Sequence, residues 1–293
     1  MFSGRFRSIA AFGLLLFVSS PLAAAEPQFF DAGGVRVRYL DVGTGEPVVL
    51  VHGFAVSYAL NWGAPGVIEA LSRDYRVIAL DVRGHGGSEK PHDDARYGEE
   101  MATDVIRLLD HLKIEKAHLV GYSMGAFITN KLVAGHPERI ASATLGGGGW
   151  IRPNDERLQV LSLLADSLEK GEGITPLMIA LSPSGLPKPN PDQIQLTNRM
   201  LMLANDQKAL AAVARTMTRL SVQEESLKAN RVPALAIIGE VDPLKIGVDE
   251  LEEVMPNLEV VVIDKADHMT TFLSPVFLKS LKDFLAAHSL RTP

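Results

Sequence analysis

The sequence predicts an α/β fold: a mostly parallel central sheet with helices on both faces and an inserted helical cap. From Val35 onward, short apolar runs typical of buried strands alternate with segments of helical periodicity. This alternation stops between about residues 150 and 230, where helical patterns follow one another without a convincing strand. A G-x-S-x-G sequence at 121–125 lies between a strand pattern and a helix pattern, which is the setting of a catalytic turn in such folds.

The composition is that of an ordinary globular protein. The 293 residues are 46% hydrophobic and 22% charged, which suffices for one large domain or a domain with an insertion. A net charge of −6 argues against nucleic acid as a partner, because phosphate binding depends on lysine and arginine. The chain has no cysteine, which excludes disulfides, a cysteine nucleophile and a thiolate metal site.

Residues 1–25 have the order of a secretory signal peptide. Two arginines precede an apolar run over residues 9–18, and three alanines at 23–25 precede Glu26. The run of about ten residues is shorter than the roughly 20 that a spanning helix needs, which favours cleavage near Ala25 over an uncleaved anchor. We therefore expect an exported protein, periplasmic or secreted, with no stable membrane span after processing.

Seven strands are predicted outside the cap. They cover residues 35–40, 47–52, 75–80, 117–121, 140–145, 233–239 and 258–263. Segment 35–40 alternates apolar residues with arginine, as a strand with one exposed face does. Segments 47–52 and 75–80 are almost continuously apolar, as expected of strands covered by helices on both faces. Apolar stripes at helical spacing over 101–112 and 277–285 predict two of those helices.

The stretch from 151 to 230 is interpreted as the cap. Its helical segments are 156–169, 175–181, 192–204 and 207–220. Some eighty residues are more than one crossover needs, which favours a cap over two ordinary crossover helices with long loops. Residues 26–150 and 231–293 then form the core. The cap contains four methionines, which either line an apolar pocket or simply form cap core: Met178, Met200, Met202 and Met217.

Ser123 is the predicted nucleophile. It is the central residue of Gly121-Tyr122-Ser123-Met124-Gly125, which follows the strand pattern HLV and precedes a helix pattern. The glycines permit a sharp strand-to-helix turn that exposes the serine hydroxyl at a helix N-terminus, where negative charge is favoured. A match of five residues alone is weak evidence; its position between strand and helix makes it specific.

A serine hydroxyl needs a base, and the base needs a carboxylate. His268 follows the last predicted strand and precedes the final helix, which places it where a parallel sheet gathers active-site residues. Asp242 follows strand 233–239 and is the predicted acid. Glu240, Asp264 and Asp267 are its rivals, and Asp267 is disfavoured because it directly precedes His268 in the sequence. The order Ser, Asp, His is then that of hydrolases with this type of turn.

Two backbone N–H groups are predicted to form an oxyanion hole. One belongs to Met124, directly after the nucleophile, and the other to Phe54 in the turn after strand 47–52, with Ala55 as the alternative. His52 is expected to shape this turn rather than to act as a base.

Several motifs together resemble the α/β-hydrolase superfamily, specifically its capped esterase, lactonase and perhydrolase-like branch. They are HGF at 52–54, DVRGHGGSEKP at 81–91, GYSMG at 121–125, GHPERI at 135–140, GEVDPL at 239–244 and ADHM at 266–269. The resemblance runs from about residue 35 to 287 and implies a Ser123–His268–Asp242 triad with Phe54 and Met124 as oxyanion donors. Epoxide hydrolases and haloalkane dehalogenases of this fold have aspartate at the position of Ser123, so the resemblance excludes them.

The expected activity is that of a serine hydrolase that cleaves a carboxylic ester or lactone through an acyl-enzyme. The expected partner is a small, apolar ester or lactone, and neither a metal nor an organic cofactor is implied. Two alternatives stay open. One is a carbon–carbon bond hydrolase that uses the same triad on a vinylogous diketone, and the other is a ligand-binding receptor of the same fold that turns over slowly.

Overall fold

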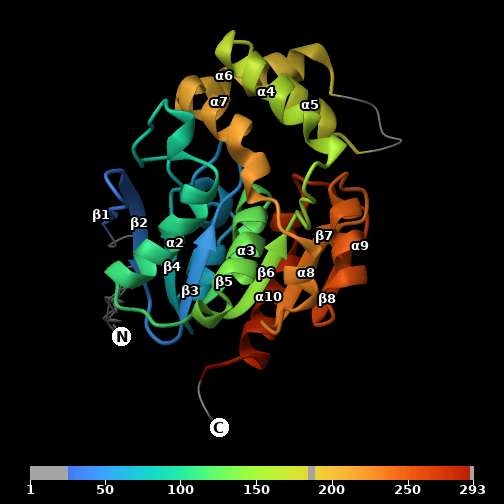
Figure 1. The fold of residues 1–293 in the computed structure, drawn as a ribbon. Coiled ribbons are helices and arrows are strands. Elements are labelled where there is room, and N and C mark those ends of the chain that lie inside the picture. The colour runs from blue at the N-terminus through green and yellow to red at the C-terminus, as the bar shows by residue number, and fades with distance from the viewer. Residues whose placement is uncertain (1–25, 184–188, 291–293) are drawn as a thin grey trace, which may run out of the picture.

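A computed structural model of the protein describes residues 26–183 and 189–290 and is built on one eight-stranded sheet (Figure 1). The strand order is β1-β2-β4-β3-β5-β6-β7-β8. The strands are β1 Gln28–Asp31, β2 Arg36–Val42, β3 Pro47–Val51, β4 Arg76–Leu80, β5 Ala117–Tyr122, β6 Ile140–Gly146, β7 Ala234–Gly239 and β8 Leu258–Ile263. Strands β3 to β8 run parallel, whereas β1 and β2 pair antiparallel at one edge. The predicted fold class is confirmed; the predicted signal peptide lies outside the described residues.

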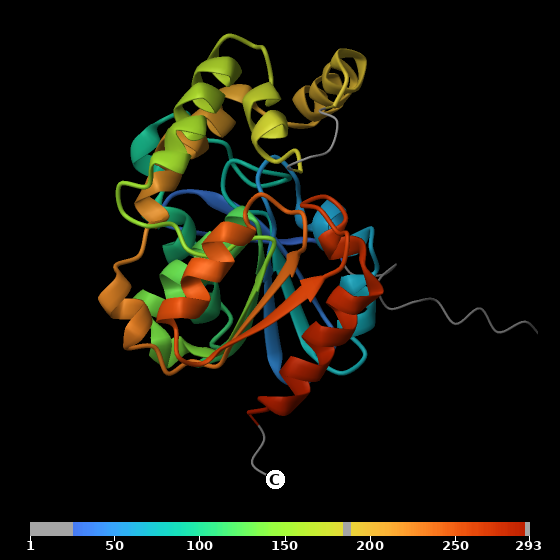
Figure 2. The same ribbon diagram turned by 90° about the vertical axis from the view of Figure 1, so that its right-hand side faces the viewer.

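Helices cover both faces of the sheet. On one face lie α1 Val67–Leu71 and α10 Pro275–Ala287, which pack on side chains of β3, β4 and β7. On the other face lie α2 Glu99–His111, α3 Met124–Gly135 and α9 Lys245–Val254. Figure 2 shows α9 and α10 on opposite sides of the sheet. Strands covered in this way are buried on both faces, which explains their continuous apolar runs.

The chain between β6 and β7 is helical. It contains α4 Gln159–Glu169, α5 Thr175–Ala180, α6 Pro191–Ala204, α7 Gln207–Thr216 and α8 Glu224–Lys228. Helices α4 to α7 lie above the carboxyl ends of the strands (Figure 1), while α8 packs beside α9 of the core. Buried leucines of α4 and α7 belong to the same apolar cluster as β3 and β5, so this part of the chain is packed onto the sheet domain.

Short helical turns complete the structure. They are η2 Ala59–Gly63, η3 Asp94–Arg96, η4 Pro137–Arg139, η5 Glu156–Leu158, η6 Met217–Leu220 and η7 Thr271–Leu273. Within the described ranges, no helix combines the length and the apolar character needed to cross a membrane.

Candidate active site

Ser123 lies at a strained turn between β5 and α3. Its φ of 54° falls in the left-handed region, which costs a non-glycine residue of the order of 1–3 kcal/mol. The two motif glycines allow the turn because the backbone passes too close for a side chain. A Cβ on Gly121 would lie 2.0 Å from the carbonyl oxygen of Gly125, and one on Gly125 would lie 2.1 Å from that of Val51. The strain is therefore held by contacts of the β3–β5–α3 backbone.

The structure brings the three predicted side chains together. His268 Nε2 lies 3.0 Å from Ser123 Oγ, and His268 Nδ1 lies 2.9 Å from Asp242 Oδ2. Asp242 and His268 are 3% and 4% exposed, so their hydrogen bond is shielded from water. Asp242 Oδ1 accepts the backbone N–H of Leu244, which fixes the carboxylate. This relay can draw a proton from the serine hydroxyl and stabilise the imidazolium that results.

The three rival carboxylates lie away from His268 Nδ1 or are engaged elsewhere, and Asp264 is an exposed side chain that pairs with Lys265. Asp267 Oδ1 accepts from the backbone N–H groups of Met269 and Thr270 and so stabilises the loop before η7. Glu240 Oε2 accepts from the backbone N–H of Lys265. Asp242 is therefore the carboxylate that the structure places on His268.

Two backbone N–H groups flank Ser123. Met124 is the first residue of α3, where an N–H has no intrahelical acceptor. Phe54 lies in the turn after β3, and a Cβ on the preceding Gly53 would lie 3.3 Å from Ser123 Cβ. Neither the Phe54 nor the Met124 N–H donates to an acceptor within the part of the chain that the structure describes. Both are available to an oxyanion formed beside Ser123.

The turn that carries Phe54 is held from two sides. Asn61 in η2 is 4% exposed, and its Oδ1 accepts the Gly53 N–H at 2.9 Å. His52 Nε2 accepts the Val82 N–H, so its Nδ1 carries the proton and donates to the Gly53 carbonyl at 2.7 Å. That carbonyl shares a peptide unit with the Phe54 N–H, so His52 orients the donor. Sequence reasoning predicted the role of His52 but missed Asn61, because no motif marks an asparagine in an irregular turn.

Tyr122, which precedes the serine, anchors the histidine loop. Its hydroxyl donates to the backbone carbonyl of His268 at 2.5 Å, and its ring lies 5.5 Å from the imidazole. Burial raises the pKa of Tyr122 well above its usual value, so the phenol remains a neutral donor. The variable position of the motif thus has a positioning role that the motif itself does not reveal.

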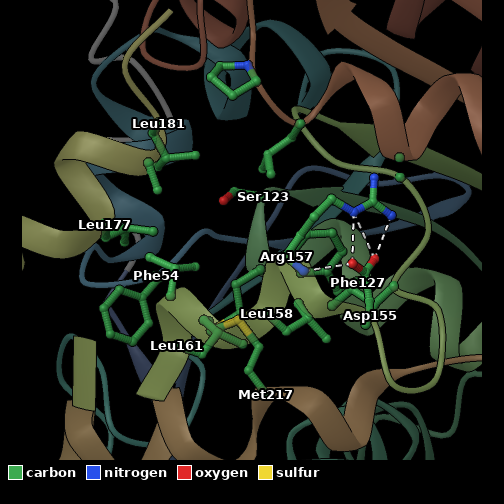
Figure 3. A pocket seen from close by; sticks show the side chains of 18 of the residues that line it. Phe54, Ser123, Phe127, Asp155, Arg157, Leu158, Leu161, Leu177, Leu181 and Met217 are labelled. Carbon is green, nitrogen blue, oxygen red and sulfur yellow. Dashed lines mark hydrogen bonds and ion pairs between the residues drawn. The ribbon is translucent and has the colours of Figure 1, made fainter. Parts of the chain in front are cut away.

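Two cavities open on Ser123. The smaller has a volume of about 260 Å³, and the larger about 480 Å³. Phe54, Leu177 and Leu181 line both with Ser123, and most of the remaining lining is apolar. Figure 3 shows the smaller cavity, where an ion pair of Arg157 with Asp155 lies to one side.

Arg157 is the only lysine or arginine among the described residues that line the two cavities, and Glu250 also binds it at 2.7 Å. Across the residues that the structure describes, no three histidine, aspartate or glutamate side chains converge as a metal site requires.

Comparison with known proteins identifies the family. A model of the α/β-hydrolase fold matches residues 46–170. A 2-hydroxy-6-oxo-6-(2'-aminophenyl)hexa-2,4-dienoic acid hydrolase of Metapseudomonas resinovorans is 30% identical over 73% of this chain and 74% of its own length. The chain belongs to the α/β-hydrolase family.

Other relatives of the chain differ in length and in the activity for which they are named. The dihydrolipoyllysine-residue acetyltransferase component of an acetoin cleaving system of Pseudomonas putida is 31% identical over 83% of this chain, which spans 64% of that relative's length. The chain spans only 32% and 42% of the next two curated relatives. Among solved structures, a thermophilic esterase of Thermogutta terrifontis is 25% identical, with a TM-score of 0.75 over 90% of this chain and 100% of the esterase.

Proposed function

We propose that this protein hydrolyses an apolar carboxylic ester or lactone through an acyl-enzyme on Ser123. The observation that carries the proposal is the Ser123–His268–Asp242 relay at the wall shared by two largely apolar cavities. The strained turn keeps the hydroxyl exposed to both cavities, and the relay supplies the base that a neutral serine lacks.

The reaction would proceed in two halves. Ser123 Oγ attacks the ester carbonyl carbon while its proton passes to His268 Nε2, and the oxyanion accepts the N–H groups of Phe54 and Met124. The carbon–oxygen bond of the leaving alcohol then breaks, and His268 returns the proton to that oxygen. In the second half, water attacks the acyl-enzyme by the same route and releases the acid and Ser123. In a lactone the leaving oxygen stays attached to the product.

A carbon–carbon bond hydrolase is the nearest alternative, because the Metapseudomonas relative is named as the hydrolase of a dienoic acid. The carboxylate of such a substrate needs a cationic or strongly donating partner. Arg157, the only lysine or arginine in the described lining of the two cavities, is already bound by Asp155 and Glu250. The only side-chain amide in that lining, Asn61, has an unpaired Nδ2 but is a neutral donor. This favours a neutral ester.

The test compares substrates and removes the nucleophile. Purified protein should hydrolyse short acyl esters faster than lactones or vinylogous diketones, with steady turnover rather than a single burst. Ser123→Ala should lower kcat by about 10⁶, the scale seen when a protease loses such a serine. Faster turnover of a diketone would establish the carbon–carbon alternative. A burst without turnover would establish the receptor alternative.

We further propose that the protein is exported and processed after Ala25, on the pattern of charge and hydrophobicity in residues 1–25. The intact mass of protein recovered from the producing cell should correspond to a chain that begins at Glu26. A full-length mass in a membrane fraction would contradict this.

A further inference from the structure

The two cavities at Ser123 are lined by different groups of the proposed catalytic site. His268 and Tyr122 line the larger cavity and are absent from the described lining of the smaller one. Other residues are found in the described lining of the smaller cavity and not of the larger one, among them Met124, Pro243, Leu244 and Ile246. The imidazole therefore faces the larger cavity, and the helix that begins at Met124 faces the smaller one.

The chemistry of ester cleavage indicates which part of the substrate lies on the imidazole side of Ser123 and which lies on the other side. When the tetrahedral intermediate collapses, the leaving oxygen takes its proton from His268 Nε2, so it must lie on the imidazole side. The acyl carbon is bonded to Ser123 Oγ, with its oxygen directed at Phe54 and Met124. The remaining substituent, which is the acyl chain, then extends away from the imidazole.

From this we infer that the smaller cavity binds the acyl part and the larger cavity binds the alcohol part of the substrate, an inference that rests on the proposed ester hydrolysis. The volumes of about 260 and 480 Å³ make the alcohol cavity nearly twice the size of the acyl cavity. The preferred substrate is therefore an open-chain ester with a bulky apolar alcohol and a smaller apolar acyl group. In a lactone the leaving oxygen is tethered to the acyl carbon, so the acyl and alcohol parts cannot occupy the two cavities separately.

Cap residues form the walls that set these preferences. Met217, at the start of η6, is 5% exposed and lies across the smaller cavity from Ser123, beside Leu161 (Figure 3). Met178 of α5 is half-buried and lines the larger cavity. Met200 of α6 is 64% exposed and is not part of the described lining of either cavity. The cap thus offers one methionine for each cavity and a matched control outside both.

The experiment measures kcat/KM of the parent protein and of each methionine variant on two series of esters. One series varies the acyl chain from acetyl to octanoyl on a fixed alcohol, and the other varies the alcohol on a fixed acetyl group. Met217→Ala should change the octanoyl-to-acetyl ratio of kcat/KM about tenfold, the lower end of what one methylene contributes in an apolar pocket. The ratio between alcohols should stay within about twofold. Met178→Ala should do the reverse, and Met200→Ala should change neither ratio.

Deacylation gives an independent readout. The alcohol has left by then, so Met178→Ala should leave the deacylation rate constant unchanged, whereas Met217→Ala should alter it for long acyl groups. Leu158→Ala, in the half-buried wall of the smaller cavity, serves the same purpose should Met217→Ala fail to fold.

Swapped dependences, or equal shifts in both series, would overturn the assignment while ester hydrolysis stood. An unaltered parent protein that neither turns over esters nor acylates Ser123 would instead overturn the proposed function.

Discussion

The inner strands of the sheet and the outer cap helices α5 and α6 differ in how completely they are buried, whereas α4 and α7 of the cap have buried inner faces. Every residue of β5 and β6 is buried, whereas α5 and α6 of the cap contain no fully buried residue. Close packing holds atoms to one arrangement, while loosely covered helices leave space between them. The core therefore positions reacting atoms, and the cap shapes the volume in which a substrate lies. Core substitutions should slow all substrates alike, and cap substitutions should change the ratio between substrates.

The largest effect on the core side is expected from Asp242. Asp242→Asn should lower kcat about 10⁴-fold for every ester, because the amide favours the wrong tautomer of His268 while the fold persists. Steady-state kinetics on several esters, with a thermal melt, measures this. Asp267→Asn is the matched control and should retain nearly full kcat. A large loss in Asp267→Asn with an active Asp242→Asn would reverse the assignment of the acid.

Substitution of Asn61 tests whether the turn that contains Gly53 and Phe54 contributes to catalysis or only to stability. Asn61→Ala removes the acceptor of the Gly53 N–H and should lower kcat by about 10²-fold with little change in KM, the scale of a lost oxyanion donor. Asn190→Ala, at the exposed N-cap of α6, is the control and should leave kcat unchanged. Equal stability loss in both variants, with no selective fall in kcat for Asn61→Ala, would make the turn purely structural.

The core should also show a pH dependence that the cap lacks. His85 lies behind Phe54, and burial lowers its pKa to about 3, with the ring of His52 at 5.3 Å contributing. The unfolded chain binds a proton near pH 6.5 that the folded chain does not, so stability is complete above that pH and falls as the pH decreases toward 3. Protonation of His85 in the unfolded chain should therefore lower the free energy of unfolding by about 1.4 kcal/mol when the pH is lowered from 7.5 to 5.5.

Urea unfolding at the two pH values measures this effect. His85→Gln should reduce the loss by that amount, while His92→Gln, at an exposed position, should reduce it far less. An identical pH dependence in parent and His85→Gln would show that His85 is charged in the folded state or does not contribute.

The smallest effect on stability is expected from an exposed ion pair that joins the cap to the core. Arg157 is partly exposed and pairs with Asp155 and with Glu250 of α9. Such pairs contribute about 0–1 kcal/mol, so Arg157→Gln should lower unfolding free energy by less than about 1 kcal/mol and leave kcat for acetyl esters unchanged. A loss of several kcal/mol would show that this contact is essential to docking of the cap.

The same contrast explains how much could be predicted from the sequence. The inner parallel strands β3 to β7 were predictable because strands covered on both faces are continuously apolar. Strand β1 was not predicted, since only Phe30 of its four residues is buried at the sheet edge. Ser123, Asp242 and His268 follow strands whose carboxyl ends share one edge, so their convergence could be anticipated. Their roles as catalytic residues stay predictions until tested.

The cap was harder to interpret. Helices α4 to α7 were predictable within a few residues and α8 was not predicted. The apolar faces of these helices do not reveal which side chains meet in a cavity. Of the four cap methionines, Met217 and Met178 line cavities, Met200 is exposed, and Met202 is half-buried outside the described linings. Those differences depend on how helices pack over the sheet, which no local pattern encodes.

Covalent labelling of Ser123 tests the central claim most directly. A fluorophosphonate should react with its phosphorus on Ser123 Oγ and release fluoride, leaving a stable mimic of the tetrahedral intermediate. Digestion and mass spectrometry should place the adduct on the peptide that contains Ser123, with one label per chain and parallel loss of esterase activity, and Ser123→Ala should take up none. An adduct on another residue, or full esterase activity in Ser123→Ala, would contradict the account.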